Sequence, residues 1–169
     1  VCSHSEEDVK IILFGGEKSI REVFWMRFLP HVQGERGRRW IGWEGKSRQE
    51  IAKRIQQEYQ LRTAEKRKIP AWIVCCLDEY PEELYFTEIV DIKKYGIYLI
   101  FLRTDPRQLP RGCREKICLK GEYGAAAEKD HTEEREFQID LPERAQFAKA
   151  AITLSAAKRK NVTVKQNFP

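Results

Sequence analysis

Three short runs of apolar residues stand out along the chain and predict the strands of a buried sheet. They cover residues 9–14, 71–77 and 97–102, and each is rich in β-branched, aromatic or cysteine side chains. Runs without apolar–polar alternation are typical of parallel strands that are covered on both faces. The first run ends at Gly15-Gly16, which predicts a tight turn directly after that strand.

The segments around these runs carry apolar residues at helical spacing. The expected helices cover residues 17–29, 47–62, 82–95 and 143–158. Ser47 is expected to cap the second helix because Glu50 follows three residues later. Gly96 is expected to end the third helix because cations precede it, an arrangement that complements the helix dipole. Since a helix joins the second strand to the third, those two strands are expected to be parallel.

The predicted fold class is α/β, with a mainly parallel sheet flanked by helices. We expect a single α/β domain over residues 1–169, a length that suits one compact core. Three less regular segments are expected within it, namely an irregular excursion at 31–45, a polar flap at about 120–134 and a mobile basic tail at 159–169. Residues 137–141 are expected to form a fourth strand.

Composition narrows the setting of the protein. No apolar run approaches the roughly 20 residues needed to cross a bilayer, and no signal peptide opens the chain, so no membrane association is expected.

The five cysteines lack metal-ligand spacing, and no metal site is expected. Cys75 and Cys76 are expected on opposite sides of a strand. Reduced, mostly buried thiols indicate an intracellular protein of the cytoplasm or nucleus. His4, His31 and His131 fall in expected loops, where surface positions are predicted.

The charge pattern leaves two interpretations of one surface segment. The chain has 31 Lys and Arg against 26 Asp and Glu, a net charge of +5, and most basic residues are interleaved with acids. That pattern favours a solvated surface over a polyanion site. The clearest basic and aromatic cluster comprises Arg36, Arg38, Arg39, Trp40 and Trp43. Its tryptophans either stack on nucleic-acid bases or, as we favour, fasten the loop to the core. As a scaffold, the protein would present this segment or the acidic turn at 78–83 to a protein partner.

An open parallel sheet binds ligands beyond the carboxyl ends of its strands. At the first such end, Gly15 and Gly16 lead through Glu17 to Lys18 and Ser19 at the start of a helix. This is the layout of a P-loop, whose amides and lysine hold phosphates. The loop is several residues shorter than GxxxxGK[ST], however, and Glu17 would set a negative charge against the phosphates. Three interpretations of the turn are open: a plain strand-to-helix connection, a degenerate P-loop, or a loop that still binds a nucleotide. We favour the first.

Further along, a buried strand ends in Asp78, Phe86-Thr87-Glu88 falls in the following helix, and Gly96 precedes a strand that ends in Arg103. The segment His131-Thr132-Glu133 comes before the last expected strand. This order resembles that of P-loop kinases of the nucleoside-monophosphate type, in particular deoxynucleoside monophosphate kinases and animal phosphomevalonate kinases. The resemblance covers most of the chain and implies a P-loop-kinase-like three-layer sandwich.

An active member of that family would transfer phosphate from ATP to a small phosphorylated acceptor such as a deoxynucleotide. By this resemblance Lys18, Asp78 and Arg103 would be the catalytic residues, supplying a phosphate-binding lysine, a Mg²⁺ ligand and a clamp. Gly15, Gly16, Lys18 and Ser19 would bind the nucleotide.

Two departures from the family weigh against catalysis. The phosphate loop is short and acidic, and Glu79-Tyr80-Pro81-Glu82-Glu83 displaces an arginine expected soon after Asp78. We therefore predict a degenerate nucleotide-kinase-like domain that needs no cofactor and acts as a non-catalytic binding or scaffold module for a protein partner. Two alternatives stay open. One is an active ATP-dependent kinase of (deoxy)nucleoside monophosphates or small phosphates, which would use ATP and Mg²⁺. The other is a nucleic-acid-binding protein that uses the Arg36–Trp43 cluster.

Overall fold

The computed structural model describes residues 4–34, 37–66, 68, 70–78, 92–113, 115–128, 135–140 and 143–164, with 128 and 157–164 described by backbone alone. The helix expected at 82–95 lies outside these residues except at its end. There, the short 3-10 helix η5 (Lys93–Tyr95) stops at Gly96, whose φ of 71° makes it the expected glycine cap.

Four parallel strands form the central sheet, in the order β2-β1-β3-β4. They are β1 (Val9–Phe14), β2 (Ile41–Gly42), β3 (Ala71–Cys76) and β4 (Ile97–Phe101). The three strands expected from the apolar runs are therefore confirmed, and β1 and β3 lie side by side over their whole length. The short strand β2 was not expected, since it falls within the irregular excursion.

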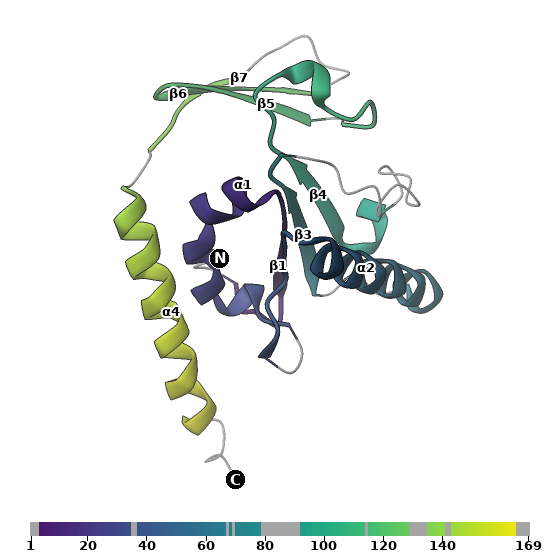
Figure 1. Ribbon diagram of the computed structural model, residues 1–169, viewed down its shortest axis with the longest axis vertical. Coiled ribbons are helices and arrows are strands. Elements are labelled where there is room, and N and C mark those ends of the chain that lie inside the picture. The colour runs from purple at the N-terminus through teal and green to yellow at the C-terminus, as the bar shows by residue number, and fades with distance from the viewer. Residues whose placement is uncertain are drawn as a thin grey trace.

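Helices cover both faces of this sheet (Figure 1). The helix α2 (Gly45–Glu65) packs one face through a core that includes Ile12, Phe14 and Ile55. The other face carries a second core of α1 (Glu17–Glu22), the 3-10 helices η1 (Phe24–Phe28) and η2 (Pro30–Val32), and α4 (Arg144–Val164). Cys75 and Cys76 belong to different cores, as expected of neighbours in a strand. The general α/β class is thus confirmed.

Two of the expected helices have different boundaries. The helix expected at 17–29 is divided, because α1 ends at Glu22 and the aromatic segment after it forms η1. Packing explains the break, since Trp25 of η1 stacks on Phe147 of α4 with ring centroids 5.3 Å apart. The second helix begins earlier than expected, and its capping box joins Glu44 and Ser47 instead of Ser47 and Glu50.

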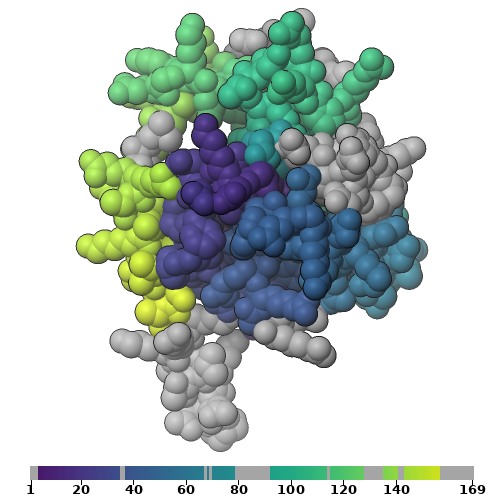
Figure 2. Space-filling model, viewed as in Figure 1, coloured from purple at the N-terminus to yellow at the C-terminus, as the bar shows by residue number. Residues whose placement is uncertain are grey.

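The chain after β4 forms a second, antiparallel sheet that the sequence did not predict. It consists of β5 (Glu115–Lys120), β6 (Tyr123–Glu128) and β7 (Arg135–Gln138), in that order. The expected flap at about 120–134 therefore contains a strand, and the strand expected at 137–141 is shifted and lies in this second sheet. Gly121, with a φ of 62°, turns β5 into β6. Figure 2 shows this sheet across the top of the molecule and α4 along its left side.

Two further expectations are corrected by burial and by helix length. The strand at 97–102 was expected to be covered on both faces, but Tyr98 and Ile100 are 39% and 43% exposed because β4 lies at the edge of the sheet, outside the second core. The tail expected to be mobile from residue 159 continues α4 as far as Val164, and residues 165–169 lie outside the described part.

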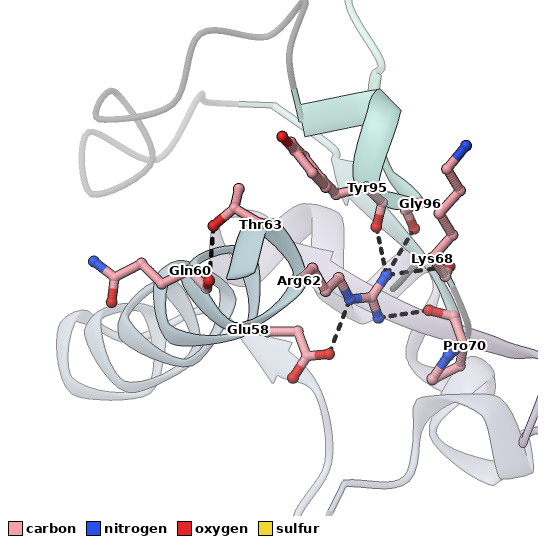
Figure 3. Close-up of polar contacts among 8 residues, drawn as sticks. All are labelled: Glu58, Gln60, Arg62, Thr63, Lys68, Pro70, Tyr95 and Gly96. Atoms are coloured by element: carbon pink, nitrogen blue, oxygen red, sulfur yellow. Dashed lines mark hydrogen bonds and ion pairs between the residues drawn. The ribbon is translucent and has the colours of Figure 1, made fainter. Parts of the chain in front are cut away.

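A fully buried arginine holds the amino ends of β3 and β4 (Figure 3). Arg62 pairs with Glu58 at 2.9 Å and donates hydrogen bonds to the carbonyls of Lys68, Pro70, Tyr95 and Gly96. The guanidinium therefore joins the end of α2 to the residues that enter two strands. Gly96 is required beside it, because a Cβ there would lie 2.1 Å from the Lys68 carbonyl oxygen.

Candidate functional site

The candidate site lies at the carboxyl edge of the parallel sheet, where several residues singled out from the sequence meet. Phe14, Cys76 and Phe101 stand in register on β1, β3 and β4, so the turns that follow these strands leave from one edge. Gly15-Gly16, Asp78 and Arg103 are therefore brought to that edge. The expectation that strand ends would gather these residues follows from parallel pairing.

The Asp78 carboxylate binds directly to the glycine turn. The Gly16 amide donates to Asp78 Oδ2 at 2.8 Å and to Oδ1 at 3.0 Å. The other amide of the turn, that of Gly15, donates to the Gly42 carbonyl at 3.1 Å. Both glycine amides thus have acceptors within the protein. The negative group that lies at the start of α1 is the Asp78 side chain.

Close packing explains why this turn contains two glycines. A Cβ on Gly15 would lie 3.2 Å from Leu77 Cβ, and a Cβ on Gly16 would lie 3.1 Å from Asp78 Oδ2. Both distances are tighter than ordinary contacts, so Leu77 or Asp78 would have to shift slightly to admit a side chain at either position. The glycines are therefore accounted for by the approach of Leu77 and Asp78.

The charged residues of α1 lie at the surface. Lys18 is exposed, Ser19 is half-buried, and α1 is only six residues long. Glu17 forms an exposed ion pair with Arg21 one turn later.

Arg103 is used at the same edge to hold two strand ends together. Its Nη1 donates to the carbonyls of Cys76 at 3.1 Å and Leu102 at 2.7 Å. The guanidinium carbon also lies 5.9 Å from the centre of the Phe101 ring. Arg103 therefore joins the ends of β3 and β4 at the edge of the sheet that also carries Asp78.

The two cysteines of β3 are kept as neutral thiols. Burial raises the pKa of Cys75 to about 11 and that of Cys76 to about 12, and the nearby Arg103 charge offsets the second shift only in part. A thiolate is the reactive form of cysteine. These side chains consequently act as small apolar core residues.

The described residues of the Arg36–Trp43 cluster lie in different surroundings. Trp40 turns inward onto Trp72 with ring centroids 5.6 Å apart, which confirms that it fastens the loop to the core. Trp43 is 38% exposed and meets the edge of Phe24. Arg38 pairs with Glu50 at 3.2 Å, Arg39 is exposed, and Arg36 lies outside the described residues.

Of the three histidines, one departs from expectation. His31 is buried, not at the surface, and its Nε2 lies 2.8 Å from the His4 carbonyl oxygen. It is buried because η2 carries it into the second core between Pro30 and Val32. His4 is exposed as expected, and His131 falls outside the described residues.

Two roles were missed by sequence reasoning, one at this site and one at the amino ends of the strands. Nothing in the spacing of the chain indicates that Asp78 would bind Gly16, because the two are 62 residues apart. A signal for Arg62 does exist, since Ile51, Ile55, Glu58 and Arg62 recur at helical spacing and continue one buried stripe of α2.

Within the residues that the structure describes, no three His, Cys, Asp or Glu side chains gather as metal ligands. No helix in that part of the chain is long and apolar enough to span a membrane. Comparison with models of protein families and with curated proteins finds no match to this sequence.

Proposed function

We propose that this chain is a degenerate nucleotide-kinase-like domain that acts as a non-catalytic binding or scaffold module. The observation that carries the proposal is the bond between Asp78 and the Gly16 amide. In a working phosphate loop, that amide and its neighbours point at the nucleotide. Here the carboxylate takes this role, and a phosphate would have to displace it against charge repulsion.

The surrounding charges support the same conclusion. Phosphoryl transfer depends on Lys, Arg and Mg²⁺ that converge on the transferred group. Lys18 is exposed on α1, Arg103 is bonded to strand carbonyls, and Glu17 adds a further negative charge at the turn. Arg103 and Asp78 are thus occupied by contacts within the protein, and Lys18 lies at the surface.

The proposal is tested by titrating the protein with ATP and Mg²⁺ while following its melting temperature and tryptophan fluorescence. A ligand at 100 times its dissociation constant stabilises a protein by about 2.7 kcal/mol. We expect no change in either signal at millimolar nucleotide.

A matched pair of variants makes the result specific. Lys18→Ala removes the candidate phosphate lysine, and Lys149→Ala removes an exposed lysine on α4. A rise in melting temperature that Lys18→Ala abolishes and Lys149→Ala preserves would overturn the proposal and favour the kinase alternative. A rise that both variants preserve would place nucleotide elsewhere on the surface and leave the turn without that role.

A further inference from the structure

A groove of about 580 Å³ lies between β4 and the segment from Leu109 to Leu119. Every residue from Ile97 to Leu102 lines it. Because successive residues of a strand point to opposite faces, a groove that touches all of them follows the edge of the strand. Its volume falls within the roughly 300–1,000 Å³ that is typical of ligand-binding pockets.

Both walls of the groove are edge strands. Among the described strands, β4 pairs only with β3, at one end of the parallel sheet, and β5 pairs only with β6, at one end of the antiparallel sheet. In Figure 1 the second sheet lies close to β4. The outer side of an edge strand presents backbone donors and acceptors to any strand that is added. One extended segment in the groove would therefore meet two such edges.

The lining of the groove is mainly apolar and unusually exposed. On β4 and just after it, Tyr98, Ile100 and Leu102 are 39%, 43% and 48% exposed. Across the groove, Ile117 and Leu119 of β5 are 65% and 64% exposed. Clustered exposed apolar residues of this kind mark interaction sites, whereas isolated ones do not.

Among the described residues, the charged ones that line the groove give it a positive balance. They are Lys93, Glu115 and Lys116. Lys93 Nζ lies 3.0 Å from Glu115 Oε1, so these two charges offset each other. The charge of Lys116 remains, which favours an occupant with negative side chains.

We propose that this groove binds an extended segment of a partner protein in which apolar and acidic residues alternate, and that the segment pairs as an added strand with β4 and β5. The inference rests on the proposed function and gives the binding module its site. In β-strand addition, backbone hydrogen bonds supply affinity, while pockets for alternate side chains supply specificity. Since β4 has five residues and β5 six, a segment of similar length fits.

The test uses a fluorescently labelled peptide of about eight residues, longer than a typical strand of five or six, in which valine and glutamate alternate. Binding to the full chain is followed by fluorescence anisotropy. We expect saturable binding that Ile100→Glu weakens at least about tenfold, because a charge placed on the apolar wall is desolvated and repelled. Ile152→Glu is the matched control, since Ile152 is 52% exposed on α4, and it should leave the affinity unchanged.

Three further measurements decide the chemistry of the occupant. A peptide with the same composition in two blocks, valine first, should bind at least about tenfold more weakly, because its side chains no longer alternate. A peptide that alternates valine and lysine should also bind more weakly. In the protein, Ile117→Glu on the opposite wall should weaken binding as Ile100→Glu does. Circular dichroism and melting curves check that each variant folds.

The inference is overturned if the alternating peptide does not bind, if the block peptide binds equally well, or if Ile152→Glu weakens binding as much as Ile100→Glu. It is also overturned if sedimentation shows that the wild-type chain dimerises and that Ile100→Glu abolishes the dimer, since the occupant would then be a second copy. None of these outcomes bears on ATP binding, so the proposed lack of nucleotide activity is judged separately by its own titration.

Discussion

The two ends of the parallel sheet are both closed by a charged side chain of the protein, but in different ways. At the amino ends, Arg62 donates to four carbonyls, pairs with Glu58 and is fully buried. At the carboxyl edge, Asp78 accepts from the Gly16 amide and is only half-buried. The Arg62 contacts are buried from solvent and hold the entry of two strands to the end of α2. The Asp78 contact holds the glycine turn at an edge that solvent still reaches.

The largest effect on stability is expected at the amino ends of the strands, where Arg62 is buried. Arg62→Met removes the donor from four carbonyls and takes the Arg62 cation away from the buried Glu58 carboxylate. Breaking a buried ion pair in this way costs about 3–5 kcal/mol. Urea denaturation should show a loss of that size in the free energy of unfolding.

The matched variant is the double change Glu58→Leu with Arg62→Met, which removes both charges. It should recover part of the stability, because no buried carboxylate remains. If Arg62→Met alone proved as stable as the wild type, Arg62 would not hold the strands as the contacts indicate.

A smaller effect is expected at the carboxyl edge. Asp78→Ala leaves the Gly16 amide without its charged acceptor, which costs about 1–3 kcal/mol. Asp78→Asn should cost less, since an amide oxygen still accepts from Gly16. An acid that is retained for ligand binding often lowers stability, so its removal can stabilise the protein. An Asp78→Ala protein more stable than the wild type would therefore contradict the structural role and point to ligand binding.

The smallest effect is expected for the acid at the start of α1. Glu17→Gln removes an exposed ion pair with Arg21, and such pairs contribute less than about 1 kcal/mol. The variant should also fail to bind ATP with Mg²⁺, because Asp78 still holds the Gly16 amide. A rise in melting temperature with nucleotide in Glu17→Gln alone would show that Glu17, and not Asp78, blocks the turn.

Local patterns predicted the parts of the fold that depend on burial of continuous apolar runs. The strands β1, β3 and β4 and their parallel pairing follow from such runs and from the helical segments between them. The second sheet was missed because β5 and β6 carry lysines, alanines and glycines, and every described residue of β5 is exposed. A strand with little burial lacks the apolar signal by which strands are recognised.

The candidate site was predicted in its position but not in its contacts. Parallel pairing alone requires Gly15, Asp78 and Arg103 to gather at one edge. That Asp78 bonds to the Gly16 amide, and that Arg103 bonds to strand carbonyls, depends on side-chain placement across residues distant in sequence. Sequence spacing carries no information about such contacts.

The sequence by itself determined an α/β chain with parallel strands and a shortened acidic glycine turn. These follow from local periodicity and turn chemistry, which act between near neighbours. Only the tertiary structure decided that Asp78 fills the turn, that Arg62 seals the opposite end, and that two edge strands face one groove. Each of these involves backbone donors or acceptors, and which partner lies beside them is decided by how distant parts of the chain pack.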